Sequence, residues 1–259
     1  VQGSAFMNVS NDLIGVQFSS FMNIANNIKG VQLVGFLNIA RGSSAGVQVS
    51  GLLNIAEEIK GAQIGFINIA NKNSGVAIGL LNFIKDGVMS PGIYWEKGNN
   101  LMFQYQGGTK AFFTTFMIGI PLSANHSYYI SGAGAGVRFN ENKSISFDVE
   151  LLFKSIRNFD YDSGELFLFK PVYMLDHDTA DAVYVIDIFN IENTMPSIRM
   201  TWNFSPINKR LSGFIALSYD MMFASWNEHV FSYWDHGKPI LSKDDDFKVY
   251  MAFSAGIKF

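Results

Sequence analysis

The chain has 259 residues, a net charge of −3 and no cysteine. The small net charge predicts no nucleic-acid partner, and the lack of cysteine excludes disulfides and thiolate metal sites. Hydrophobic residues make up 48% and aromatic residues 15% of the chain, yet no apolar run approaches the ~18–20 residues of a transmembrane helix. This combination is typical of a transmembrane β-barrel, in which only alternate residues face lipid.

Residues 1–86 consist of six repeats of 14–16 residues, of which Gly46–Lys60 is a representative copy. One glutamine and one asparagine recur in nearly every copy, at Gln2, Gln17, Gln32, Gln48 and Gln63 and at Asn8, Asn23, Asn38, Asn54, Asn68 and Asn82. Six copies at one period are stronger evidence of the architecture than any local pattern, so the fold of this region is predicted from the repeat.

Side chains alternate within each repeat. Val47, Val49 and Leu53 fall on one face at period two, whereas Gln48 and Asn54 fall on the other, which is strand spacing. The charged residues of this region lie in the short segments between the apolar runs. Each repeat therefore reads as about ten residues of uncharged strand followed by a turn of about five.

Two architectures fit such a unit. A transmembrane barrel strand needs about 9–11 residues, and a β-solenoid coil would stack Gln and Asn in ladders along its axis. The gap from Gln63 to Asn68 is five residues, against six in the preceding copies. A solenoid can accommodate the missing residue at a corner, whereas a barrel strand needs a β-bulge to do so. A solenoid would expose charge-free faces and a row of Phe, with Val49 and Leu53 as core residues. Antiparallel barrel strands would instead set Gln opposite Asn, and we prefer the barrel.

Residues 87–259 continue as amphipathic strands with no linker after the repeats. In Ser144–Lys154, Phe147 and Val149 alternate with Asp148 and Glu150. About ten further strands are predicted, near residues 92–96, 101–106, 110–120, 127–139, 144–156, 166–175, 182–190, 197–204, 211–224 and 247–259. The predicted fold is all-β: one transmembrane antiparallel β-barrel over residues 1–259, with about 14–16 strands that include the repeats. The alternative is an N-terminal β-solenoid followed by a C-terminal barrel of about ten strands.

The chain ends in the amphipathic stretch Tyr250–Phe259, with a terminal aromatic residue. This stretch resembles the C-terminal signal that the barrel-assembly machinery of Gram-negative outer membranes recognises. The repeats, written G-V-Q-x-x-G-x-x-N-I-A, resemble those of the surface-repeat proteins of spirochaetes and Bacteroidetes, a family with no established activity. The resemblance implies a location in the cell outer membrane, with outer-membrane lipid, the assembly machinery and other envelope proteins as partners and Phe259 as the assembly signal.

Two clusters that contain histidine are candidate catalytic or metal sites. One connection holds Asp176, His177, Asp178 and Asp181, but it lacks the Gly and the downstream Glu of an EF-hand, so a solvated turn is predicted. The segment Trp226–Asp246 holds His229 and His236, without a spacing that marks a nucleophile. We therefore predict no catalytic residue, no cofactor and no metal.

The inward face of the predicted barrel is the strongest functional candidate. It offers neutral amides from the repeats and charges of both signs from the rest, with these lumen-lining candidates: Gln48, Asn54, Arg138, Asp148, Glu150, Lys154, Arg199 and Asp220. Such a lumen either passes small polar solutes or closes through ion pairs. The prediction is a non-enzymatic barrel, either a passive channel or a surface or scaffold component of an envelope complex. The alternatives are a solenoid interaction module fused to a barrel, and a lipid-modifying barrel enzyme that uses His229 or His236.

Overall fold

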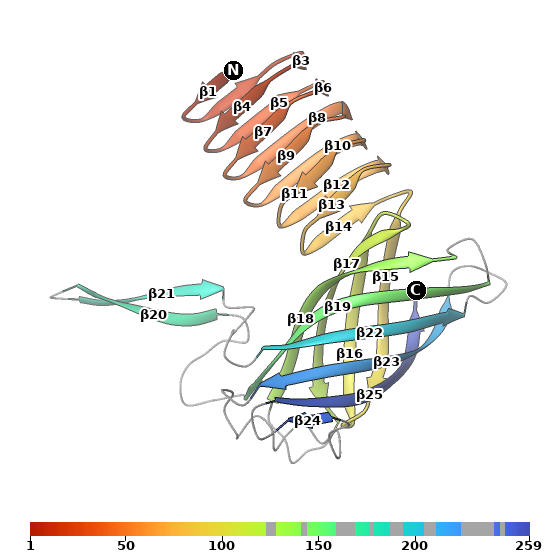
Figure 1. Ribbon diagram of the computed structural model, residues 1–259. Helices are drawn as coiled ribbons and strands as arrows, with labels where there is room; N and C mark the ends of the chain where they lie inside the picture. Colours follow the sequence, from red (N-terminus) through yellow and green to blue (C-terminus); the bar gives the residue numbers. More distant parts are fainter. Residues whose placement is uncertain are drawn as a thin grey trace.

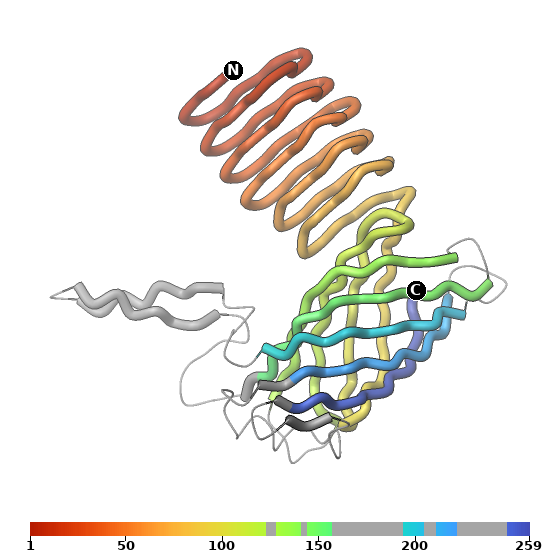
Figure 2. Tube along the Cα trace, in the orientation of Figure 1, coloured from red at the N-terminus to blue at the C-terminus, as the bar shows by residue number. Residues whose placement is uncertain are grey.

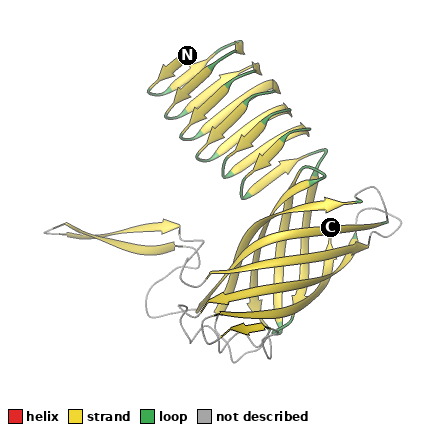
Figure 3. Ribbon diagram, in the orientation of Figure 1, coloured by secondary structure: helices red, strands yellow, loops and turns green. Residues whose placement is uncertain are grey.

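The computed structural model describes residues 1–122, 128–140, 144–158, 169–176, 179–186, 194–204, 211–223, 241–243 and 247–259; of these, side chains are described except at 157–158, 169–176, 179–186, 222–223, 241–243 and 247. The described residues form strands and the turns between them (Figure 3). No helix in this part of the chain is long and apolar enough to cross a membrane. The strands build a parallel β-solenoid from the N-terminal residues and an antiparallel barrel from the remainder (Figure 1).

The solenoid comprises residues 1–86, wound as stacked coils (Figure 2). Its first sheet contains, in order, β1 (Gln2–Ser4), β4 (Val16–Ser19), β7 (Val31–Val34), β9 (Val47–Ser50), β11 (Ala62–Ile64) and β13 (Val76–Ile78). Its second sheet contains β2 (Met7–Val9), β5 (Met22–Ala25), β8 (Leu37–Ser44), β10 (Leu53–Ile59), β12 (Ile67–Asn73) and β14 (Leu81–Ile84), with β3 (Asp12–Leu13) and β6 (Asn27–Ile28) beside it. All pairings are parallel, so each coil contributes one strand to each sheet.

The prediction that the repeats are barrel strands, in a barrel of about 14–16 strands, is wrong, and the solenoid alternative is the one observed. Equivalent residues stack on one another: Gln17 pairs in register with Gln32 and not with an asparagine. The short gap between Gln63 and Asn68 is absorbed at the corner between the two sheets. Identical amides in register gain a hydrogen bond in every coil, which an antiparallel arrangement of the same strands does not provide.

The interior of the solenoid combines amide ladders with an apolar cluster, and the outward side chains of its two sheets are largely apolar. Gln32 donates from Nε2 to Gln17 Oε1 at 2.9 Å, and Asn38 donates from Nδ2 to Asn54 Oδ1 at 3.0 Å. Small apolar residues fill the remaining interior, namely Leu13, Ala25, Ile28, Ala40, Ala56, Ile59, Ala70, Ala77 and Ile84. The expectation that Val49 and Leu53 would be core residues of a solenoid is therefore wrong, because alternation turns Gln48 and Asn54 inward.

Glycine is required where successive coils turn back from the second sheet to the first. Gly30, Gly46, Gly61 and Gly75 stack in one column, and a Cβ on Gly46 would collide with the carbonyl oxygen of Gly30. The backbones therefore approach more closely here than any side chain allows.

The barrel has eight strands: β15 (Val88–Glu96), β16 (Asn100–Gly108), β17 (Phe112–Pro121), β18 (Tyr128–Phe139), β19 (Ile145–Asn158), β22 (Thr194–Phe204), β23 (Ser212–Phe223) and β25 (Phe247–Lys258). All neighbours are antiparallel, and pairing of β15 with β25 closes the ring. The predicted all-β class and antiparallel barrel are confirmed, but the count of about ten barrel strands is too high. Two of the expected strands, now β20 (Phe169–Asp176) and β21 (Thr179–Ile186), pair with each other in a separate sheet, and β24 (Leu241–Lys243) pairs with β25.

The solenoid enters the barrel at the end that carries its short connections. The chain passes from β14 into the start of β15, at the end of the barrel where β16, β18 and β22 also end (Figure 1). We call this the short-turn end and the opposite one, where β19 and β23 end, the long-loop end, since 35 and 23 residues of the sequence separate these two strands from the next barrel strand.

Candidate functional site inside the barrel

Alternation along the barrel strands turns one set of side chains into the interior. It contains all six charged residues predicted to line the lumen: Arg138, Asp148, Glu150, Lys154, Arg199 and Asp220. The two predicted amides, Gln48 and Asn54, are buried inside the solenoid instead, because the repeats do not contribute strands to the barrel. The six charged residues extend from one end of the barrel to the other in three groups.

The middle group is centred on an ion pair between Arg199 and Glu150. Nε and Nη2 of Arg199 donate to the two carboxylate oxygens of Glu150 at 2.8 and 2.9 Å. Arg199 also donates to Gln104 Oε1 at 3.0 Å and to the Tyr94 hydroxyl at 3.2 Å. Gln106 donates to Glu150 Oε1 at 3.0 Å. Both charges are fully desolvated, and the bidentate geometry offsets the cost of their burial.

The group at the short-turn end is organised by Asp148. Arg138 binds its two oxygens at 2.7 and 2.8 Å, and Asn203 donates to Oδ2 at 2.9 Å. Lys258 Nζ lies 3.5 Å from Asp148 Oδ2 and 2.7 Å from Asn203 Oδ1, and 4.9 Å from the centre of the Phe214 ring. The last strand is thereby tied to the interior beside the end of the chain.

Towards the long-loop end, Lys154 contacts two carboxylates. Its Nζ lies 2.7 Å from Glu96 Oε1 and 3.2 Å from Asp220 Oδ1, and all three side chains have no exposed surface. A buried lysine that contacts two carboxylates in this way is a paired charge and presents no free charge to solvent.

The network is balanced in charge and crosses the barrel. Among the described side chains, the ion pairs of this network join four cations (Arg138, Lys154, Arg199, Lys258) to four carboxylates (Glu96, Asp148, Glu150, Asp220). The bond from Arg199 to Gln104 joins β22 to β16, and the bond from Lys154 to Glu96 joins β19 to β15. Each pair of strands is four positions apart in a ring of eight, so these bonds span its full width.

Apolar side chains fill the space that the network leaves. Buried residues from seven of the strands pack into one cluster, which consists of Tyr94, Met102, Met117, Tyr128, Ile130, Leu152, Ile156, Met195, Phe214 and Ala216. An eight-stranded barrel has an interior just wide enough for side chains to fill. The interior described here is accordingly a packed core with a charged layer, and it offers no wide lumen.

Sequence reasoning missed several partners of the network, above all Glu96, Gln104 and Gln106. The alternation of each strand already indicated that these side chains point inward. Glu96 shares the inward face of β15 with Tyr94, and Gln104 shares that of β16 with Gln106. The predicted strands near 92–96 and 101–106 contained them, but strand number and stagger decide which opposite residue each one meets.

A second polar contact joins the solenoid to the barrel. Asn82, the last rung of the asparagine ladder, donates from Nδ2 to Thr114 Oγ1 at 2.6 Å and to Gly107 O at 3.4 Å. Tyr105 donates its hydroxyl hydrogen to Asn82 O at 2.9 Å, and its ring centre lies 5.5 Å from that of Phe83. The final coil is therefore covered by β16 and β17, and the ladder ends on a barrel side chain.

The other sequence candidates fall where side chains are not described. His177, Asp178, His229 and His236 lie outside the described residues, and only the backbone of Asp176 and Asp181 is described. Among the residues whose side chains are described, no group of three or more His, Cys, Asp or Glu could hold a metal ion.

Comparisons with known proteins give little beyond this geometry. No family model matches the chain, and no curated protein matches it. Among solved structures, the outer-membrane protein Ail of Yersinia pestis, determined in a phospholipid bilayer nanodisc, matches with 12% sequence identity and a TM-score of 0.32 over 67% of this chain and 99% of that chain. A TM-score of this size does not show a common fold.

Proposed function

We propose that this chain is an outer-membrane protein whose closed barrel is a non-enzymatic membrane anchor and scaffold for the solenoid in the cell envelope. The observation that carries the proposal is the combination of an apolar barrel exterior with a filled, charge-balanced interior.

The exterior of the barrel has the character of a lipid-facing surface. Every exposed side chain within the described barrel strands is apolar, with about half of the residue surface exposed at Leu151 (50%), Ile215 (52%) and Phe253 (52%). Aromatic rings gather at the short-turn end, where the ring centre of Phe147 lies 6.2 Å from that of Phe139 and 5.2 Å from that of Trp202. Aromatic girdles beside an apolar band are typical of outer-membrane barrels.

Strand length supports the same reading. The eight barrel strands run from 9 to 14 residues, and a tilted membrane-spanning strand needs about 9–11. Every strand has a hydrogen-bonded neighbour on both sides, which is the condition for strands to lie in hydrocarbon.

The filled interior favours the scaffold over the passive channel. A channel needs a continuous wet path, whereas the bonds of Arg199 and Lys154 to opposite strands cross the interior at two levels. The charges there match one another in number, so they serve as partners and do not select ions.

The barrel-assembly machinery and outer-membrane lipid are the partners that this role requires. Phe259 follows directly on β25, is 54% exposed, and donates its backbone N–H to Pro91 O at 2.8 Å, beside the seam between the first and last strands. An outward aromatic side chain at this seam supports a role for Phe259 in assembly.

Single-channel conductance in planar bilayers tests the scaffold role. The purified, refolded chain is added to bilayers in KCl and in a bulky-ion salt, with a sixteen-stranded porin as positive control. Insertion is verified by flotation of the same preparation with vesicles. We expect insertion without conductance steps. Stable ohmic steps would refute the closed interior and restore the passive channel.

A further inference from the structure

The outer faces of the solenoid form an uncharged apolar surface of unusual extent. Rows of equivalent apolar residues run along both sheets and along the corner that joins them. In the corner row, the ring centres of Phe6, Phe21 and Phe36 are stacked 5.0 Å apart, and Phe21 and Phe36 remain 40% and 42% exposed. An exposed apolar surface that continues over six coils marks a site of contact with something other than water.

Charge is confined to one side of the stack. Every charged residue of the solenoid lies in the segments 11–15, 26–30, 41–46, 57–61, 71–75 and 85–86, which contain β3, β6 and the ends of β8, β10 and β12 and lead from the second sheet back to the first; we call this side the charged corner. Lys29 and Lys72 are exposed on this charged corner. The solenoid thus has three apolar sides, formed by the outer faces of the two sheets and by the corner that joins them, and the charged corner runs along its whole length.

The apolar sides offer almost no hydrogen-bonding groups to a partner. Within residues 1–84, all of which the structure describes, Ser20 is the only residue of the outward rows whose side chain has a polar group. Backbone groups are paired between coils even at the corner, where Leu37 donates its N–H to Phe21 O at 3.0 Å. A protein interface usually carries about one hydrogen bond per 100–200 Å², and this surface offers almost none.

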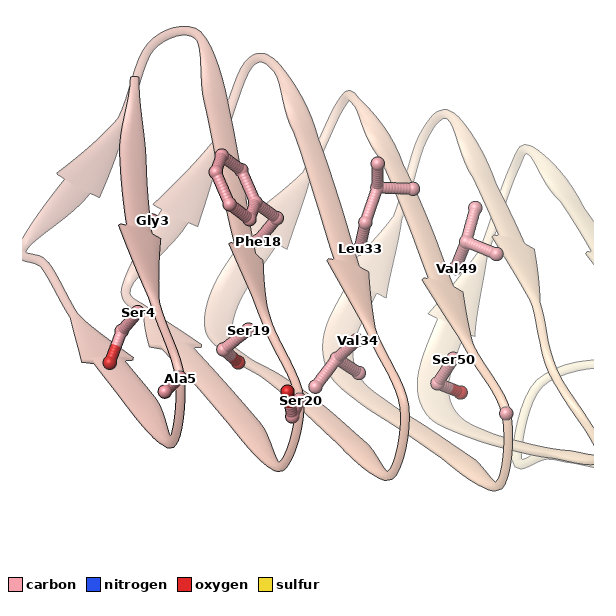
Figure 4. A pocket seen from close by; sticks show the side chains of 11 residues that line it. Gly3, Ser4, Ala5, Phe18, Ser19, Ser20, Leu33, Val34, Val49 and Ser50 are labelled. Atoms are coloured by element: carbon pink, nitrogen blue, oxygen red, sulfur yellow. The ribbon is translucent and has the colours of Figure 1, made fainter.

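A shallow groove on the outer face of the first sheet is lined mainly by apolar residues. Its volume is about 900 Å³, and it crosses four coils. Figure 4 shows Phe18, Leu33 and Val49 in one row along it, with Ser19 in the adjacent row. The Ser19 hydroxyl donates to Met22 O at 2.9 Å, so it is already engaged within the protein.

The apolar surface continues from the solenoid onto the barrel. Phe83 on the last coil is 37% exposed and lies beside Tyr105 on β16, and Phe103 on the same strand is 43% exposed on the barrel exterior. No charged residue of β14 or β16 interrupts this path. Whatever covers the barrel exterior therefore meets a matching surface on the solenoid.

We infer that the three apolar sides of the solenoid are covered by the acyl chains of a phospholipid bilayer, with the charged corner turned to water and headgroups. Along these sides, beyond the edge strands β1 and β2 of the first coil, backbone groups are paired between coils and the outward side chains other than Ser20 carry no polar atoms, which are the two requirements of hydrocarbon. The amides of the two ladders from Gln17 to Asn82 are enclosed. The inference extends the proposed membrane role from the barrel to residues 1–84 and rests on it.

Site-directed spin labelling in proteoliposomes tests this inference, and the chain has no cysteine to remove beforehand. Single variants Leu33→Cys and Ile39→Cys probe the outer faces of the two sheets. Lys29→Cys is the aqueous control on the charged corner, and Leu151→Cys is the lipid control on the barrel. Each labelled full-length chain is reconstituted in phosphatidylethanolamine and phosphatidylglycerol vesicles, and collision rates with oxygen and with a water-soluble nickel chelate are measured.

The expected result is a several-fold higher oxygen-to-nickel ratio at Leu33 and Ile39 than at Lys29, close to the ratio at Leu151. If Leu151 gives the lipid result while both solenoid positions resemble Lys29, the inference is wrong and the proposed barrel function stands. If Leu151 itself resembles Lys29, the proposed function fails as well. Protection of the solenoid positions from both reagents would overturn the inference in favour of a protein cover, such as a second copy of this chain.

Discussion

Replacing Arg199 with Met tests whether the charged network holds the barrel together. The substitution removes two bonds to Glu150 and one each to Gln104 and Tyr94. Glu150 keeps Gln106, Thr115 and Thr201 as donors but loses its bidentate cation in a fully buried position. Removal of one partner from a buried ion pair costs about 3–5 kcal/mol, because the other charge is left uncompensated. We expect the free energy of unfolding of Arg199→Met to fall by about that amount.

The assay is urea unfolding of the chain refolded in vesicles, followed by the fluorescence of tryptophans such as Trp95 and Trp202. Lys110→Met, at an exposed turn position, is the matched control and should change the unfolding free energy by less than about 0.5 kcal/mol. Adding Glu150→Gln to Arg199→Met should restore about 1–3 kcal/mol, since the unpaired charge is removed. A loss below about 1 kcal/mol for Arg199→Met, or no recovery in the double variant, would refute the network as described.

Two further substitutions probe the solenoid by hydrogen exchange of the full-length chain. Gly46→Ala forces a Cβ against the Gly30 carbonyl and should destabilise the solenoid by about 1–3 kcal/mol while barrel amides keep their protection; unchanged exchange in residues 1–86 would contradict the close stacking of the coils. Asn54→Ala interrupts the asparagine ladder, removing bonds at 3.0 and 2.9 Å, and should cost about 1–3 kcal/mol because buried partners lose their bonds. Asn71→Ala, on the charged corner, is its control, and equal effects of the two asparagine variants would exclude a stabilising ladder.

The strands were predictable from the sequence, but their partners were not. Alternation correctly turned Gln48 and Asn54 away from Val49 and Leu53, yet a period of two does not say whether the next strand returns antiparallel or begins a new coil. The discriminating clue was the gap from Gln63 to Asn68, which a corner tolerates without disturbing either sheet. The charge-free outer faces argue against a solenoid only if those faces meet water.

The same limit applies to the barrel. The segments near 166–175 and 182–190 were correctly read as strands, but pairing with each other is invisible in their local pattern. The charges of Glu150 and Arg199 were placed on the inward face correctly. Their balance with Glu96 and Lys258, and the reach of Arg199 to Gln104 on the opposite strand, depend on a ring of eight strands. The choice between an open and a closed interior therefore needed the three-dimensional structure.

The central claim, that the repeats are stacked coils, is tested most directly by cysteine crosslinking in the native cysteine-free chain. Ile24 and Ile39 are partners on adjacent parallel strands, where Cα atoms lie about 4.8 Å apart, within reach of a disulfide. An antiparallel hairpin of the same two repeats that sets Gln32 opposite Asn23 would instead place Ile24 opposite Val31. We predict that Ile24→Cys with Ile39→Cys crosslinks rapidly on mild oxidation, and that Ile24→Cys with Val31→Cys does not. Crosslinking of the second pair but not of the first would contradict the solenoid and restore the repeats as barrel strands.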